Sequence, residues 1–193
     1  MFWILACDVP PGASSVEVES TPTEVSDFSS AARADLRMKR WRQLSLDLQG
    51  ALELPADEVC RETGLYDCFD IHTVPMGGLS RDNGLYHPTQ GITVTTGLAM
   101  ERVVLQACWN RLELDREGHP VVFTVDLEGD SDEGLDDQVD DLYHRLLARN
   151  PEEAERALLV DFHDEVLDEG GGTAEWALMS CLIVGTTTEA LLY

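Results

Sequence analysis

The strongest constraint on the fold is a series of helix boundary signals, each beside a segment whose apolar residues recur at helical spacing. The clearest signal lies at residues 150–153, where Asn, Pro and two Glu suit an N-cap, the first helical position and the positive end of a helix dipole. Further start signals stand at Ser29–Ser30, Thr95–Thr96 and Thr173. The pattern predicts a mainly α-helical bundle of five or six helices.

We expect helices over residues 30–49, 55–64, 95–114, 135–149, 151–169 and 173–184. The fifth is expected to bury Ala154, Leu158, Phe162 and Val166 on one face, and the sixth, apolar on nearly all sides, to lie at the centre of the core. Residues 64–94 contain seven Gly or Pro, which predicts one long irregular loop. Residues 120–125 predict a short β-strand as a minor β element.

Composition divides the 193 residues into three parts. Residues 1–7 are an apolar segment, and residues 8–28 are rich in Pro, Ser and acids and contain no base, which is typical of a flexible linker. Residues 29–193 are long enough for a single helical domain with a core of its own.

The chain is strongly acidic, with 37 acidic and 13 basic residues and a formal net charge of −24. Such a chain repels phosphate backbones and anionic lipid head groups, so nucleic acid is excluded as a partner. Cations and basic proteins are the partners that this charge favours, while the simpler interpretation is that it keeps the protein in solution.

Residues 1–7, Met-Phe-Trp-Ile-Leu-Ala-Cys, form an apolar N-terminal segment that resembles a truncated bacterial lipoprotein signal. Residues 4–7, Ile-Leu-Ala-Cys, are similar to a lipobox, in which a signal peptidase cuts before the Cys and the thiol is acylated. The resemblance implies lipidation of Cys7, membrane attachment, and a place in the cell envelope or at the cell surface as an outer-membrane lipoprotein. The run before Cys7 lacks a charged n-region and is shorter than an h-region of about 7–15 residues. The alternatives are a start codon further upstream or a plain apolar tail.

The number of cysteines, five, also agrees with export. In an exported protein an odd number leaves one cysteine without an internal disulfide, and Cys7 is the candidate. If Cys7 carries lipid, the other four can form two disulfides in three possible pairings. Cys60 with Cys68 would close a small loop, and Cys108 with Cys181 would join two apolar helices. The alternative is four buried free thiols.

Three stretches, residues 41–50, 142–155 and 176–193, carry a resemblance. In this order they are similar to helical domains of unknown function from bacterial secreted proteins that often accompany c-type cytochromes. The resemblance implies an exported helical domain near redox partners and supplies no catalytic residues. Covalent haem requires Cys-x-x-Cys-His, and the spacing of Cys60, Cys68 and His72 does not match it.

An acidic loop, defined as residues 126–137, is the sharpest local feature. Acids at alternating positions offer oxygen ligands for calcium. The candidate ligands are Asp126, Glu128, Asp130, Asp132 and Asp137. The loop departs from an EF-hand, since Ser131 replaces the turn glycine and Asp137 replaces the bidentate Glu. The alternative is a solvated loop whose last acids cap the next helix.

No His-Glu-x-x-His, phosphate-loop or nucleophile-elbow motif occurs in the chain. We therefore expect a non-enzymatic exported protein, lipid-anchored in the envelope, that acts as a binding or scaffold module for another exported protein. The alternatives are a calcium- or metal-dependent exported protein using the acidic loop, and a haem or electron-transfer accessory protein.

Overall fold

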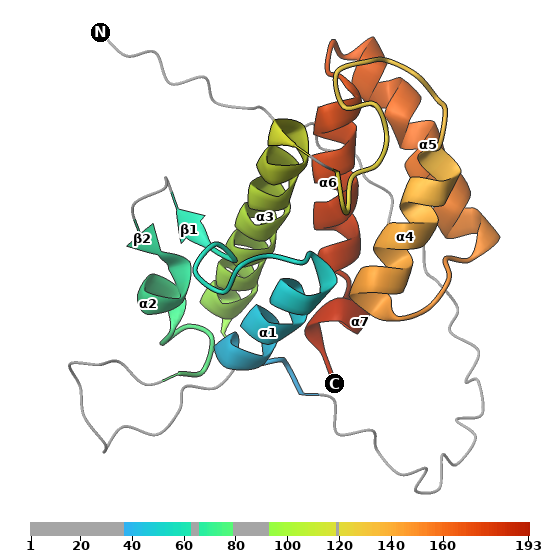
Figure 1. Cartoon of the computed structure of the whole chain (residues 1–193). Helices are drawn as coiled ribbons and strands as arrows, with labels where there is room; N and C mark the ends of the chain where they lie inside the picture. The colour runs from blue at the N-terminus through green and yellow to red at the C-terminus, as the bar shows by residue number, and fades with distance from the viewer. Residues whose placement is uncertain (1–36, 63–65, 79–92, 119) are drawn as a thin grey trace, which may run out of the picture. The chain divides into compact units, whose positions relative to one another are not determined.

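The computed structural model describes residues 37–62, 66–78, 93–118 and 120–193, which belong to the second of two compact units, residues 36–193. Within these residues the fold is mainly helical, with seven helices and a minimal β pairing (Figure 1). The elements are α1 (Trp41–Ala51), β1 (Arg61–Glu62), β2 (Tyr66–Asp67), α2 (Cys68–His72), α3 (Val94–Glu117), α4 (Leu135–Leu147), α5 (Glu153–Asp168), α6 (Thr173–Gly185) and α7 (Thr188–Leu191). The predicted helical fold class is confirmed.

Helix α6 forms the centre of the bundle and packs against α3, α4 and α5 (Figure 1). Its Trp176 is fully buried, and the indole nitrogen donates to the backbone oxygen of Leu159 at 2.7 Å. At its end α6 approaches α3 so closely that a methyl group on Gly185 would lie 2.7 Å from Val104. The expected central position is confirmed, although Met179 and Ile183 on the same helix remain exposed.

Two disulfides join these elements. Cys108 on α3 is bonded to Cys181 on α6, and Cys60 is bonded to Cys68 across the short hairpin β1–β2. These are the two pairings that the sequence suggested. Paired cysteines of this kind are typical of proteins that fold in an oxidising compartment outside the cytoplasm. Among the described residues, no helix has the length and apolar character needed to cross a bilayer.

Helix α5 matches the predicted apolar face only in part: Phe162 and Val166 pack against the core, whereas Ala154 and Leu158 are exposed. Leu158 is 64% exposed, whereas Leu159 and His163 are completely buried. The helix also begins later than its Asn-Pro signal suggested, with Glu152 as N-cap and the Glu155 carboxylate accepting from the Glu152 backbone nitrogen at 2.7 Å. The buried face follows from the packing of Leu159 and His163 against Trp176 on α6.

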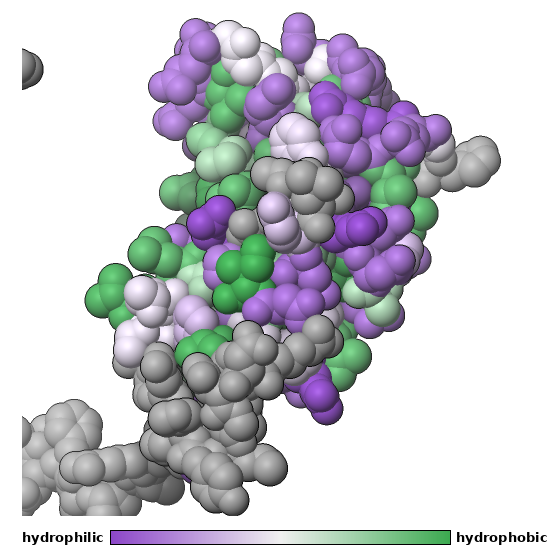
Figure 2. Space-filling view, turned by 90° about the vertical axis from the view of Figure 1, so that its left-hand side faces the viewer, coloured by the Kyte–Doolittle hydropathy of each residue, from purple (hydrophilic) through white to green (hydrophobic). Residues whose placement is uncertain are grey.

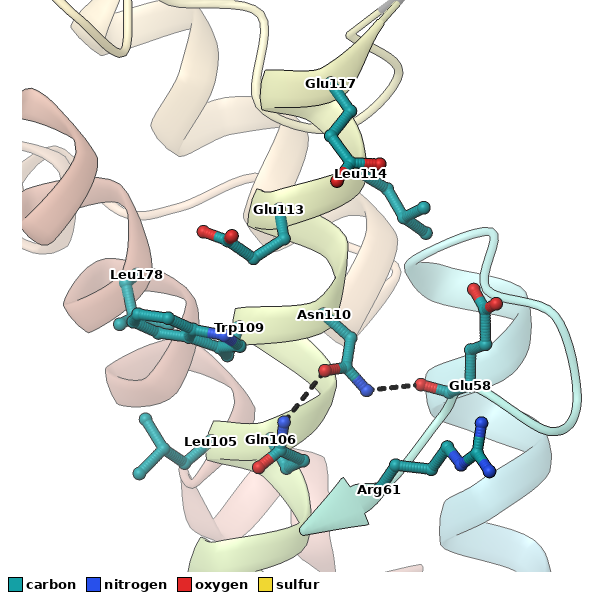
Figure 3. Close-up of a pocket in the computed structure, with 10 residues that line it drawn as sticks. All are labelled: Glu58, Arg61, Leu105, Gln106, Trp109, Asn110, Glu113, Leu114, Glu117 and Leu178. Carbon is teal, nitrogen blue, oxygen red and sulfur yellow. Dashed lines mark hydrogen bonds between the residues drawn. The ribbon is translucent and has the colours of Figure 1, made fainter. Parts of the chain in front are cut away.

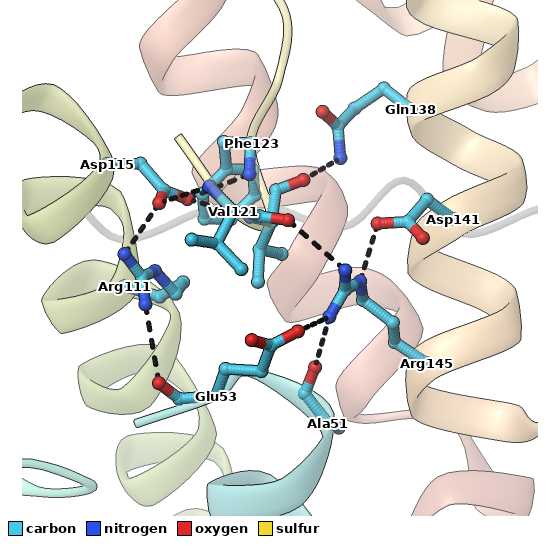
Figure 4. A network of polar contacts seen from close by, with 10 residues as sticks. Ala51, Glu53, Arg111, Asp115, Val121, Phe123, Gln138, Asp141 and Arg145 are labelled. Atoms are coloured by element: carbon cyan, nitrogen blue, oxygen red, sulfur yellow. Dashed lines mark hydrogen bonds and ion pairs between the residues drawn. The ribbon is translucent and has the colours of Figure 1, made fainter. Parts of the chain in front are cut away.

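The predicted strand at 120–125 is wrong, because side chains take the backbone hydrogen bonds that a partner strand would have satisfied (Figure 4). The buried carboxylate of Asp115 accepts from the backbone nitrogens of residues 121, 122 and 123 at 2.8, 3.2 and 2.8 Å. The Gln138 amide nitrogen donates to the backbone oxygen of residue 122 at 2.9 Å, and the Gln138 amide oxygen accepts from the backbone nitrogen of residue 124 at 2.8 Å. Asp115 also pairs with buried Arg111 at 2.6 Å. The β element lies instead at β1 and β2, which pair antiparallel.

Three other boundaries differ from the predictions. Residues 37–40 are not helical, because this segment lies beside the C-terminus through bonds such as that from the Lys39 nitrogen to the Leu191 oxygen at 2.8 Å. Residues 56–58 form turns rather than a helix, with the Glu58 nitrogen donating to the Pro55 oxygen at 2.9 Å, and β1 follows them. The predicted loop 64–94 contains the short helix α2, and its residues 64–65 and 79–92 lie outside the described part.

Candidate functional site

A groove of about 760 Å³ runs along α3 between the turn at residues 58–61 and helix α6 (Figure 3). Its lining combines apolar, amide and acidic side chains. The apolar ones are Leu105, Trp109, Leu114 and Leu178; the others are Glu58, Arg61, Gln106, Asn110, Glu113 and Glu117. Figure 2 views the molecule from the side on which α3 and the hairpin lie in Figure 1, and apolar side chains there alternate with hydrophilic ones.

The apolar residues of the groove arise from the two-sided pattern of α3. Val104 and Cys108 face the core, whereas their sequence neighbours Leu105 and Trp109 point outward and are 39% and 45% exposed. Leu105 and Trp109 are four residues apart, so they lie on one side of the helix. The α3 helix thus presents an aromatic ring and an aliphatic chain to solvent directly beside its disulfide.

The walls of the groove are held in place by covalent and hydrogen bonds. The Asn110 amide donates to the Glu58 backbone oxygen at 2.6 Å and accepts from the Gln106 amide at 2.8 Å (Figure 3). The disulfide between Cys108 and Cys181 fixes α3 to α6, which carries Leu178. A preformed, rigid site of this kind loses little conformational entropy on binding.

The groove is chemically suited to bind rather than repel a cationic apolar segment. Three carboxylates, those of Glu58, Glu113 and Glu117, stand around its apolar residues, against the single guanidinium of Arg61. Glu113 also pairs with Arg116 at 3.2 Å. The excess of carboxylates favours a partner that brings Lys or Arg to the rim and apolar side chains to Trp109.

In the described part of the chain, the five predicted calcium ligands do not lie together in one cluster. The Asp126 carboxylate accepts from the Glu128 nitrogen at 3.2 Å, Glu128 lies 3.3 Å from Arg116, and Asp130 is exposed. Asp137 is in the first turn of α4. Among the described residues, only Asp132 of these five belongs to a cluster of three side chains that could bind a metal ion. The other two members are His163 and Asp164 of α5.

Sequence reasoning missed His163. The signal that could have found it is the i, i+4 spacing of Leu159 and His163, each one residue after the predicted Leu158 and Phe162. Asp164 follows directly in sequence.

Cys7, the predicted lipidation site, lies outside the described residues.

No family model, no curated protein and no solved structure matches the chain. The expected resemblance of residues 41–50, 142–155 and 176–193 to helical domains of secreted proteins therefore stays a prediction.

Proposed function

We propose that this protein is an exported binding module whose α3 groove docks a basic, amphipathic segment of another exported protein. The observation that carries the proposal is Trp109, which is 45% exposed although it lies beside a disulfide that pins its helix to the centre of the core. Half-exposed tryptophans in rigid surroundings are typical anchors of protein interfaces.

Charge identifies the class of partner. The chain carries a net charge of −24, and three of its carboxylates, those of Glu58, Glu113 and Glu117, line the groove. An approaching basic segment is attracted over long range and oriented at the rim, which raises the association rate, while burial of Leu105 and Trp109 supplies affinity. An acidic or neutral segment would gain affinity from the burial of these two side chains but would not be attracted by the charge.

The proposal includes tethering at the cell envelope. Acylation of Cys7 would attach the chain to a membrane, and residues 8–28 would act as a spacer between that lipid and the folded domain. The two disulfides support export, since such bonds persist in oxidising compartments. A partner in the same compartment would then meet the groove within the reach of this flexible spacer from the membrane.

The proposal is tested with a helical peptide of Lys and Leu as probe and a Glu and Leu peptide of equal length as its counterpart. Binding to the oxidised full chain is measured by fluorescence anisotropy at physiological salt. We expect Trp109→Gln to weaken binding of the basic peptide by at least about tenfold, as for an interface anchor. The matched control is Leu158→Gln, because Leu158 is an exposed apolar residue of α5 outside the groove.

Equal affinity of wild type and Trp109→Gln would contradict docking in the groove and would assign the binding to overall charge. A second contradictory outcome is self-association, detected by sedimentation, that the Trp109→Gln change abolishes. The occupant would then be a second copy of the chain rather than a basic partner.

A further inference from the structure

Hydrogen bonds fix the tautomer of the buried His163 ring. The Thr173 hydroxyl lies 2.7 Å from the backbone oxygen of Gly129, and because a carbonyl can only accept, the hydroxyl proton is used there. The same hydroxyl oxygen lies 3.0 Å from His163 Nε2 and must accept from it. A neutral His163 therefore carries its proton on Nε2 and leaves a lone pair on Nδ1.

The Nδ1 atom of His163 is buried and, within the part of the chain that the structure describes, has no hydrogen-bond partner. A carboxylate oxygen of Asp132, Oδ1, lies 3.5 Å from it and is also an acceptor. Two acceptors that face each other repel unless a proton or a metal cation lies between them. The Asp164 carboxylate adds a second negative group, and the three ligand atoms lie within 4.8 Å of one another.

We propose that Asp132, His163 and Asp164 bind a divalent transition metal ion of the zinc class. Zinc bonds of about 2.0–2.2 Å in tetrahedral geometry place two ligand atoms about 3.4 Å apart, close to the 3.5 Å between Asp132 Oδ1 and His163 Nδ1. An imidazole nitrogen with two carboxylates suits zinc and its neighbours better than calcium, which takes six to eight oxygens.

The surroundings of His163 resemble the outer shell of a metal site. A metal-binding histidine usually donates its other ring nitrogen to a fixed acceptor, and here that acceptor is Thr173. The ring also stands edge-on to Trp176, with centroids 5.5 Å apart, so its direction is fixed before any ion arrives. The site shares only Asp132 with the calcium ligands that the sequence predicted.

An ion at this position would join the acidic loop to α5. Asp132 belongs to the loop, and His163 and Asp164 belong to the helix, so coordination would close a contact between two separate segments. Because the Asp132 side chain is 80% exposed and Asp164 is also exposed, solvent can supply the remaining ligands. This site is independent of the α3 groove, and its failure would leave the proposed docking unaffected.

The test is calorimetric titration of the oxidised full chain, stripped of metal with a chelator, with zinc chloride and separately with calcium chloride. We expect one high-affinity zinc ion per chain and weaker binding of calcium. Asp164→Asn and Thr173→Val should each weaken zinc binding by about 10- to 100-fold, the first by removing a ligand and the second by freeing the ring. The melting temperature of metal-free Asp164→Asn should equal that of wild type, because Asp164 is exposed.

The matched controls are Asp130→Asn in the loop and Asp161→Asn on α5, which remove exposed acids outside the group. Loss of zinc affinity in the controls equal to that in Asp164→Asn would overturn the proposal in favour of diffuse attraction to an acidic surface. Absence of zinc binding to wild type would also overturn it. So would ring nitrogen shifts, measured by NMR, that show His163 doubly protonated at neutral pH and unchanged by zinc, since a proton would then occupy the position of the ion.

Discussion

Arg149 illustrates how single side chains hold this helical bundle together. Its guanidinium donates to both carboxylate oxygens of Glu155, at 2.7 and 2.8 Å, and to Glu189 at 2.9 Å. It also lies over the Tyr143 ring, 5.1 Å from the centroid. These contacts connect the ends of α4, α5 and α7. The Arg149 hydrogen bonds lower the pKa of Glu155 from 4.5 to about 2, with a further contribution from the Glu152 backbone nitrogen.

This pKa leads to a prediction about acid stability. Because the pKa of Glu155 is lower in the folded state, its contribution to the free energy of unfolding is present above pH 4.5 and is lost as the pH falls toward 2. We expect Glu155→Gln to be less stable than wild type at neutral pH, with a difference that shrinks between pH 4.5 and 2. Urea unfolding across this range measures it. A difference that is constant with pH would contradict the assigned cause.

The buried pair of Arg111 and Asp115 should matter far more than exposed pairs. Asp115→Ala would leave Arg111 without its carboxylate and three backbone nitrogens without an acceptor. We expect a loss of about 3–5 kcal/mol in the free energy of unfolding. The control is Asp141→Ala, which breaks an ion pair with Arg145 at the surface and should cost about 1 kcal/mol or less. Urea unfolding at neutral pH compares the two variants, and equal losses would refute the role of Asp115.

At the scale of elements, the two disulfides close loops of very different length. The bond between Cys108 and Cys181 spans 73 residues and that between Cys60 and Cys68 spans 8. Loop-closure entropy predicts losses of about 4 kcal/mol for the double variant Cys108→Ala with Cys181→Ala, and about 2.5 kcal/mol for Cys60→Ala with Cys68→Ala. Chemical denaturation of both variants tests this order. The reverse order would show that native-state contacts outweigh chain entropy.

Helix existence could be predicted from the sequence, because caps and apolar periodicity are local signals. The segments that became α3, α4, α5 and α6 were all expected, and α6 was placed at the centre. The strand at 120–125 could not be recognised as wrong, since the groups that satisfy its backbone, Asp115 and Gln138, lie on two other segments. Tertiary contacts between separate elements decide such cases.

The candidate sites were harder to predict from the sequence than the helices. The α3 groove depends on which side of that helix faces the core, and the outward direction of Trp109 is set by the packing of Cys108 and Val104. The acidic loop was noticed, but its partner His163 comes from α5, whose buried face was predicted one residue away. A small error in helix rotation therefore hid the histidine.

At the scale of the whole molecule, we propose an exported, tethered binding module. This hypothesis combines the two disulfides, the acidic surface and the N-terminal Cys7. It predicts that protein isolated from its native membrane fraction lacks residues 1–6 and carries acyl chains on Cys7. Intact-mass measurement checks this, with a Cys7→Ser variant as control. A chain that retains Met1 and carries no lipid would remove the tether, although not the groove.

The most direct test of the central claim, an exported and disulfide-bonded fold, is the state of the cysteines inside the native cell. Intact cells are treated with a membrane-permeant alkylating agent, and the denatured protein is analysed by mass spectrometry before and after reduction. We expect Cys60, Cys68, Cys108 and Cys181 to escape alkylation until they are reduced. Alkylation of all four without reduction would place the chain in a reducing compartment and contradict both export and the proposed partner.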